Sequence, residues 1–276
     1  MIRNIITTLI ALALLVASAS TISAQTDQNL PVISNGETVE SALNGNTTAV
    51  LFAFNAAEGD TVTVNLGLGD TATFDPVMLI LGPAGQVAAA TDSSATINVP
   101  FSGSYFILVS TVDSIDSVQL GQSAEEFPER QPFIVSVSGN NPPPQAGSNL
   151  AYFRSALEDG TSFEGYSSPA EPVYFFVFDG SEGETIDIIL TSSEVNPLLM
   201  VFDPAGILVG SNDDAQGLDL PGDGDAAIEG LRLPTDGTYL VFATDVEYHT
   251  VPARLESEEE DVEPFEGGDF VITLVR

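Results

Sequence analysis

The sequence predicts an all-β protein made of two tandem antiparallel β-sandwich domains, jelly-roll-like in strand number, after a signal peptide. Three observations support this fold class. The apolar segments are short, rich in β-branched and aromatic residues, and bounded by Gly, Pro, Asn and Asp, which is typical of strands. No segment after the leader sustains a helical period. An internal repeat runs through the chain twice, and such a repeat determines the architecture.

The first 24 residues have the composition of a secretory signal peptide. Arg3 supplies the positive charge, residues 5–16 form the apolar stretch, and small residues continue to Ala24. We predict cleavage after Ala24, with cleavage after Ala19 or retention of the segment as a membrane anchor as the alternatives. The expected product is secreted, extracellular or periplasmic, and its mature chain does not insert into a membrane.

The repeat defines the expected domains. In order along the chain, the matched stretches are residues 54–62 and 178–186, 75–85 and 196–206, 103–109 and 237–243, and 133–137 and 270–274. We therefore predict domains at residues 25–138 and 149–276, each of a size that can fold around one core. Residues 139–148 are predicted to be a short, stiff linker, because their three consecutive prolines lack N–H donors and favour an extended conformation.

The strands within each copy are predicted from local pattern. Residues 61–64 and 185–188 alternate polar and apolar side chains, so one side of each strand should face a core and the other water. The Pro-Ala-Gly segments at 83–85 and 204–206 are predicted to end hairpins. In the first copy, strands are expected near residues 50–54, 61–66, 77–81, 86–89, 95–99, 105–110 and 133–138, with counterparts in the second copy.

The composition excludes several classes of function. The chain has 40 acidic residues, six arginines, no lysine, no cysteine and one histidine, with a formal net charge of −34. It therefore cannot use a thiol or a Schiff-base lysine, and it should repel nucleic acid, whose binding depends on Lys and Arg. His249 is the one imidazole, and no nucleophile-elbow or metalloprotease motif is present. We expect no enzymatic activity; a paired-carboxylate hydrolase is the alternative that residue types leave open.

Several short motifs recur in the same order in both copies. They are the turns Glu58-Gly-Asp-Thr61 and Glu182-Gly-Glu-Thr185, Asp75-Pro76 and Asn196-Pro197, the two Pro-Ala-Gly turns, and Gly103-Ser-Tyr105 and Gly237-Thr-Tyr239. Ser211-Asn-Asp-Asp214 accompanies them in the second copy. With these motifs the chain resembles a tandem pair of bacterial pre-peptidase C-terminal domains, which are related to collagen-binding modules of collagenases. The resemblance covers nearly all of the mature chain. It implies calcium-associated β-sandwiches that serve secretion, adhesion or targeting rather than catalysis.

A calcium site is predicted in the second copy, since residues 143–276 hold 27 of the 40 acids. The candidate ligands are Asn212, Asp213, Asp214, Asp223 and Asp225. Calcium takes six to eight oxygen ligands, and Gly-rich loops can bring carboxylates together around it. The alternative is a solvated acidic loop, because turns favour Asp and Gly. In the first copy only Asp92 lies in the matching, shorter loop, so any site there should be weak or absent.

The expected partner is an extracellular protein or polysaccharide. Aromatic side chains of the second copy could stack on sugars or grip a peptide, or could instead pack in the core. These residues are Tyr152, Phe153, Tyr166, Tyr174 and Tyr248. The alternative is a structural or accessory cell-envelope protein that has no discrete ligand.

Overall fold

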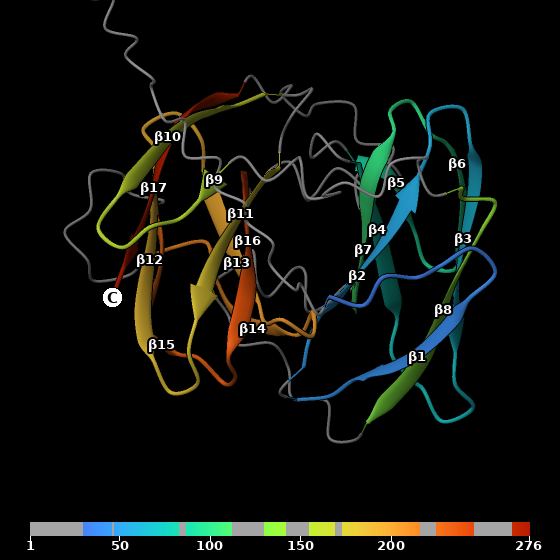
Figure 1. Ribbon diagram of the computed structural model, residues 1–276. Helices are drawn as coiled ribbons and strands as arrows, with labels where there is room; N and C mark the ends of the chain where they lie inside the picture. Colours follow the sequence, from blue (N-terminus) through green and yellow to red (C-terminus); the bar gives the residue numbers. More distant parts are fainter. Residues whose placement is uncertain are drawn as a thin grey trace, which may run out of the picture.

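The predicted all-β fold is confirmed. The computed structural model describes residues 30–45, 47–82, 87–111, 130–141, 155–168, 173–215, 225–245 and 267–276, and every regular element within these ranges is a strand. The strands form two β-sandwiches that lie side by side (Figure 1). No helix among the described residues is long and apolar enough to cross a membrane. The predicted signal peptide at residues 1–24 lies outside the described ranges.

The N-terminal sandwich consists of two four-stranded antiparallel sheets. Its outer sheet has the order β1-β8-β3-β6 and its inner sheet the order β2-β7-β4-β5. The strands are β1 (Thr38–Leu43), β2 (Val50–Ala56), β3 (Thr61–Leu68), β4 (Pro76–Leu81), β5 (Val87–Thr91), β6 (Ser94–Asn98), β7 (Gly103–Thr111) and β8 (Gln131–Ser138). Strand β1 had not been predicted, because its largely polar sequence lacks the apolar run that marks the other strands.

The C-terminal sandwich repeats this arrangement. Its outer sheet has the order β10-β17-β12-β15 and its inner sheet the order β14-β13-β16-β11-β9. The strands are β9 (Ser155–Ala156), β10 (Ser162–Ser167), β11 (Tyr174–Gly180), β12 (Thr185–Thr191), β13 (Pro197–Phe202), β14 (Leu208–Asn212), β15 (Ala226–Arg232), β16 (Gly237–Asp245) and β17 (Gly268–Val275). Strand β9 pairs with β11 in parallel, as Val32 does with Ala53 of β2.

The repeated motifs make the same contacts in both sandwiches. Phe54 stacks on Tyr105 with ring centroids 5.3 Å apart, and Phe178 stacks on Tyr239 at 5.1 Å. Each tyrosine hydroxyl donates a hydrogen bond to the carbonyl oxygen four residues upstream, at 3.0 Å for Tyr105 and 2.7 Å for Tyr239. The sequence repeat therefore corresponds to one structural unit that occurs twice.

Each sandwich has its own hydrophobic core between its two sheets. The N-terminal core includes Phe52, Phe54 and Phe133, and the C-terminal core includes Phe176 and Phe178. The outer sheets contribute only one face to these cores, as the alternating burial of β3 and β12 shows. The prediction of a half-buried strand at residues 61–64 is therefore confirmed, since alternate residues of β3 face the core.

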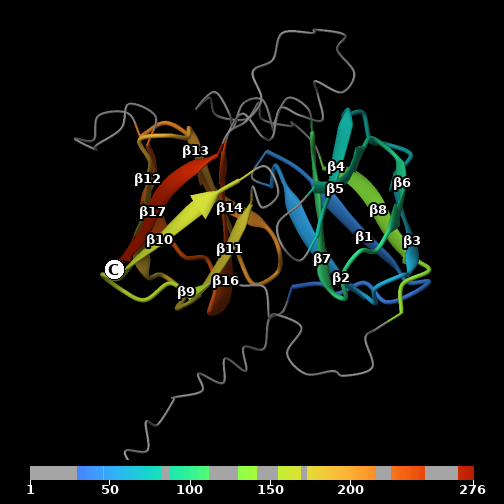
Figure 2. The ribbon, with the colours of Figure 1, turned by 90° about the horizontal axis from the view of Figure 1, so that it is seen from above.

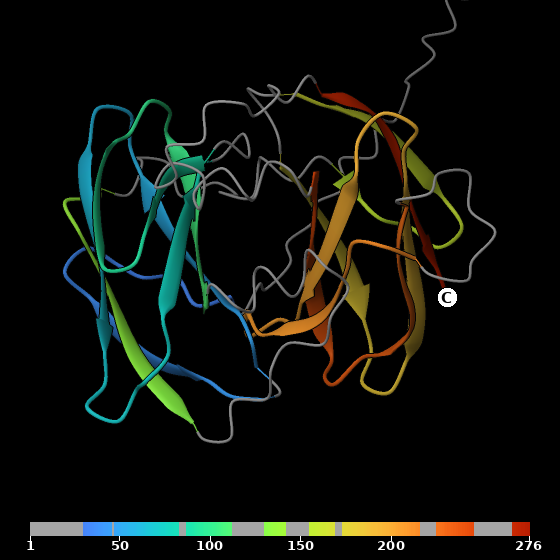
Figure 3. The ribbon, with the colours of Figure 1, turned by 180° about the vertical axis from the view of Figure 1, so that it is seen from behind.

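A third core joins the two sandwiches. The inner sheets pack face to face through a cluster of buried side chains from both halves, so the molecule has four layers (Figures 2 and 3). Phe106 of β7 lies against Phe175 of β11, with ring centroids 4.8 Å apart. The cluster consists of Leu30, Ala49, Leu51, Ala53, Leu79, Leu81, Phe106 and Leu108 on one side, and Val173, Phe175, Val177, Leu198, Met200, Phe202, Leu208, Leu240 and Phe242 on the other.

This third core explains why some strands do not alternate. In β7 all nine residues are buried, and in β13 all six are. A strand covered on both faces is apolar at successive positions rather than at every second one. The continuous apolar runs of the inner sheets therefore mark two-sided burial.

Hydrogen bonds also cross between the halves. Leu51 N donates to Gly206 O at 2.7 Å, and Leu208 N donates to Ala49 O at 3.2 Å. Gly206 belongs to the second Pro-Ala-Gly turn, has φ +81°, and lies so close to β2 that a side chain there would overlap the Leu51 carbonyl oxygen. The glycine is thus required both by the turn and by the contact between the halves.

The same turn carries a buried carboxylate. Asp203 is 9% exposed, and one of its oxygens accepts hydrogen bonds from Ala205 N at 2.9 Å and Ile207 N at 2.8 Å. Burial raises the pKa of Asp203 above its usual value, although these backbone hydrogen bonds act in the opposite direction. The Asp203 side chain therefore braces the turn, and its burial in the native state favours the protonated form.

The beginning of the predicted linker is held by the first sandwich. Asn140 is buried and its Nδ2 donates to Asn55 O at 3.0 Å, while Asn141 Nδ2 donates to Asp60 Oδ1 at 2.8 Å. The Asn141 side chain thereby lowers the pKa of Asp60. The prolines at 142–144 lie outside the described residues, and the predicted boundaries of the two domains stay a prediction.

Replacing Gly206 by alanine should destabilise the protein more than replacing Gly36. Both glycines have positive φ, +81° and +77°, so alanine strains the backbone similarly at both, by about 1–2 kcal/mol. Only Gly206 faces a neighbouring atom, since nothing lies within 4 Å of a Cβ at Gly36. Urea unfolding should show an additional loss of about 1 kcal/mol or more for Gly206→Ala. Equal losses for the two variants would contradict the close contact.

Asp203→Asn should change the pH dependence of stability. A raised folded-state pKa means that protonation favours the native state, so the native chain loses stability as the pH rises through that pKa. The asparagine variant lacks this loss and retains an acceptor oxygen for the turn. It should match the native chain at low pH and be more stable than the native chain at neutral pH. Urea unfolding at several pH values measures this; a constant difference across pH would refute it.

Candidate functional site

The predicted calcium ligands lie at one end of the C-terminal sandwich, where β14 leads to β15. Asn212 ends β14, Asp213 and Asp214 follow it, and Asp225 immediately precedes β15. Ala215 N donates to the carbonyl oxygen of Asp225 at 2.7 Å. This bond closes the base of the connection and brings its two acidic ends together. Asp223 lies outside the described residues.

Two of these carboxylates are inside the protein. Asp213 is 1% exposed and Asp225 is 2% exposed, whereas Asp214 is partly exposed. Asp225 Oδ1 accepts a hydrogen bond from Ser192 N at 2.9 Å. Aspartate is rarely buried to this degree unless its charge is compensated. The sequence pattern placed these residues in one connection, but their burial had not been predicted.

Asn212 has a structural role at this end of the sandwich. Its Oδ1 accepts a hydrogen bond from Ala227 N at 2.9 Å, and its Nδ2 donates to Asp214 O at 3.2 Å. The amide thus ties β14 to β15, across the two sheets of the sandwich. Asn212 positions the neighbouring aspartates through these bonds.

A third buried carboxylate, not among the predicted ligands, holds the neighbouring loop. Asp245 ends β16, is 2% exposed, and its Oδ2 accepts a hydrogen bond from Asn196 N at 3.0 Å. Asp225 and Asp245 therefore anchor the two ends of the connection between β12 and β13, at Ser192 and Asn196. The available signal in the sequence was an acid directly after the continuous apolar run of β16.

The matching end of the N-terminal sandwich is a tight turn. Ser93 Oγ donates to Asp92 Oδ1 at 2.8 Å, Ser93 N donates to Thr91 Oγ1 at 3.3 Å, and Thr91 Oγ1 donates to Ser94 O at 3.3 Å. Asp92 is exposed. The two copies thus differ here: the first closes the turn with its own hydroxyl groups, and the second places acids inside.

The described residues alone do not make a complete metal site. They contain no group of three or more His, Cys, Asp or Glu side chains placed to hold one ion. Asp213 and Asp225 supply carboxylate oxygens of the kind that calcium prefers, and any further ligands from Asp223 belong to the part not described. The donor chemistry fits calcium, and the site stays a prediction.

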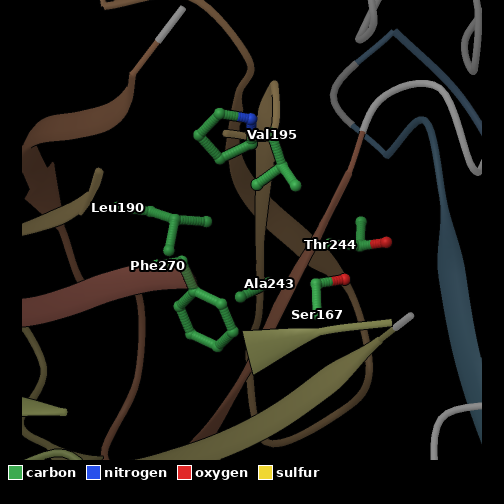
Figure 4. A pocket seen from close by; sticks show the side chains of 7 residues that line it. Ser167, Leu190, Val195, Ala243, Thr244 and Phe270 are labelled. Atoms are coloured by element: carbon green, nitrogen blue, oxygen red, sulfur yellow. The ribbon is translucent and has the colours of Figure 1, made fainter. Parts of the chain in front are cut away.

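A pocket beside the connection between β12 and β13 is small and apolar. It has a volume of about 10 Å³ and is lined by Ser167, Leu190, Val195, Pro197, Ala243, Thr244 and Phe270 (Figure 4). A space of this size holds one water molecule at most. No acid or base lines it, so this pocket cannot provide general acid–base catalysis.

The aromatic residues considered for binding divide between surface and core. Tyr166 is 51% exposed on β10, and its carbonyl oxygen accepts a hydrogen bond from the Tyr174 hydroxyl. Tyr174 belongs to the C-terminal core. For this residue the alternative prediction, that it packs in the core, is correct. Three other aromatics and the single histidine lie outside the described residues: Tyr152, Phe153, Tyr248 and His249.

Comparison with known proteins finds likeness only among solved structures. No family model matches the chain, and no curated protein matches it. The pre-peptidase C-terminal domain of a collagenase from Bacillus anthracis is 9% identical, with a TM-score of 0.29, and covers 44% of this chain and 92% of its own. A periplasmic inhibitor of g-type lysozyme from Aeromonas hydrophila is 17% identical, with a TM-score of 0.30, and covers 40% and 96%. Likeness at this level assigns the chain neither a family nor a partner.

Proposed function

We propose that the protein is a secreted, non-catalytic binding protein whose two β-sandwiches engage an extracellular protein or polysaccharide. One observation carries the proposal. The inner sheets are covered on both faces by the three cores, so the outer sheets and the loops supply the contact surface of the packed body. Concave catalytic sites usually bring together acids, bases or a metal, whereas a binding protein needs mainly a well-ordered surface.

Export and the resemblance to pre-peptidase C-terminal domains belong to this proposal. The signal-like composition of residues 1–24 supports export, and the repeated turns and Gly-Ser/Thr-Tyr motifs support the resemblance. A net charge of −34 keeps such a protein soluble and disfavours anionic partners.

We further propose that calcium braces the acidic end of the C-terminal sandwich, with Asp213 and Asp225 as central ligands. Burial of two carboxylates near one loop base raises the free energy of the charged protein unless a cation or hydrogen bonds compensate. Asn212, Asp214 and Asp223 complete the proposed ligand set. Binding to the native state alone would add to the stability of the fold.

Calcium should bind the mature protein and raise its melting temperature. Calorimetric titration should give a dissociation constant of about 10⁻⁴–10⁻³ M, the range of extracellular calcium modules. Asp213→Asn and Asp225→Asn should lose this binding because each removes a charged ligand. Asp92→Asn, the matched change in the first copy, should retain it. Absence of both heat and a melting shift in the native protein would rule out the site, whatever the variants do.

The mature protein should also be retained by extracellular polymers. Its binding to collagen fibrils and to insoluble neutral polysaccharide particles can be measured by sedimentation, with an equally acidic globular protein as the control for charge. Retention on at least one polymer, with a dissociation constant of about 1–100 μM, is expected. Retention on neither would favour a structural or accessory envelope protein without a discrete ligand.

A further inference from the structure

The outer face of β3, β6 and β8 is covered by uncharged polar side chains. These strands alternate, so their second residues point away from the N-terminal core, and this face is on the side of the sheet remote from the C-terminal half (Figure 1). We call it the hydroxyl-amide face; its polar members are Thr61, Thr63, Asn65, Ser94, Thr96, Asn98, Ser136 and Ser138. The remaining outward positions of these described strands are Gly67, Pro132 and Ile134, so these three strands place no charge on the face. Glu40 of the neighbouring edge strand β1 pairs with Ile134 and borders the face with a carboxylate.

Hydrogen bonds between strands order these side chains. Asn65 is central: its Oδ1 accepts from Ser94 Oγ at 2.9 Å, and its Nδ2 donates to Ser136 Oγ at 3.5 Å. Thr63 and Thr96 share a hydrogen bond of 3.0 Å between their hydroxyl groups. Side chains already held in one conformation lose little entropy when a partner binds.

Two further hydrogen bonds extend this lattice of polar side chains. Thr61 Oγ1 donates to Asn98 Oδ1 at 3.2 Å, and Ser138 Oγ donates to Thr63 O at 3.5 Å. Outward residues repeat about every 6.7 Å along a strand and about every 4.8 Å between strands. Each hydroxyl group keeps acceptor capacity beyond the bond that it makes. The face thus offers a flat, regular array of hydrogen-bonding groups.

The fold itself does not require this surface. The C-terminal sandwich has the same outer sheet, yet Asp187 occupies the position of Thr63, Ile189 that of Asn65, and Val275 that of Ser138. Arg232 pairs with Thr185 where Asn98 pairs with Thr61. The uncharged polar lattice is therefore a property of the first copy alone, which points to a role in recognition rather than in folding.

The charge of the chain restricts the partner. A protein of net charge −34 repels an anionic polymer, and the side chains of the hydroxyl-amide face itself offer a cationic partner no carboxylate for an ion pair. The groups on this face donate and accept hydrogen bonds, as sugar hydroxyl groups do. We propose that the hydroxyl-amide face binds a neutral polysaccharide. This inference rests on the proposed function and specifies its partner class and its surface.

The test compares two Asn→Asp variants that change the net charge equally. Asn65→Asp puts a carboxylate in the lattice and removes the amide donor to Ser136. Asn35→Asp lies in the loop before β1, beside the end of β8 and not among the polar members of the face, and the aspartate oxygen can still accept the hydrogen bond that Gly139 N donates to Asn35 Oδ1 at 3.0 Å. Sedimentation of the mature protein with cellulose, chitin and β-glucan particles measures retention, and circular dichroism and melting temperature verify that each variant is folded.

The native protein and Asn35→Asp should bind at least one of these polysaccharides equally, and Asn65→Asp should bind about tenfold more weakly or not at all. Added salt should leave binding unchanged, because the contact carries no charge. Equal binding by all three proteins would show that the polysaccharide binds elsewhere and would refute the inference. No retention of the native protein on any polysaccharide would refute the inference, and retention on collagen fibrils would then leave the proposed function intact. An unfolded Asn65→Asp variant would be replaced by Thr96→Glu, on the same face.

Discussion

The apolar contact between the two inner sheets is the constraint on which the rest of the molecule depends. Each sandwich fills its own interior, but its inner sheet still presents a second apolar face that water would cover if the halves were apart. Phe106 and Phe175 meet within this buried contact. Burial of such aromatic area is the largest favourable contribution to association. The third core therefore turns two sandwiches into one four-layered body.

The two faces of the third core use equivalent positions of the repeat, but the side chains at these positions differ in size. Seven residues of the N-terminal face have repeat counterparts in the C-terminal face, from Ala49 and Val173 to Leu108 and Phe242. The C-terminal member is larger at most of these positions, whereas Phe106 faces a group of aromatic rings from the other half. Small side chains opposite small ones tend to leave voids and large ones opposite large ones tend to overlap, and both cost stability. The N-terminal face with its smaller side chains therefore packs well against the C-terminal face with its larger ones.

Each sequence pattern predicts only which faces of a strand are buried, and this limits how much of the structure could be predicted. Alternation at residues 61–64 encodes one buried face, so that strand and its orientation were predictable. The continuous run of β7 encodes two covered faces, but not what covers the second one, since any apolar surface fits an apolar surface. For the candidate site, Asp213 and Asp225 are linked by loop composition. Asp245 ends the next strand, β16, so it lies outside that loop in sequence and only folding brings it to the same end of the sandwich.

The shared core also explains where the two copies were free to diverge. Inner-sheet residues contact both a sandwich interior and the opposite half, so a change there disturbs two cores at once. The outward-facing side chains of the outer sheets contact only their neighbours and solvent, and substitutions there have small effects on stability. The exchange of Thr63 and Asn65 for Asp187 and Ile189 falls on that unconstrained surface. A difference that folding neither requires nor forbids is where selection for a partner can act, and for this reason the proposed binding face lies on an outer sheet.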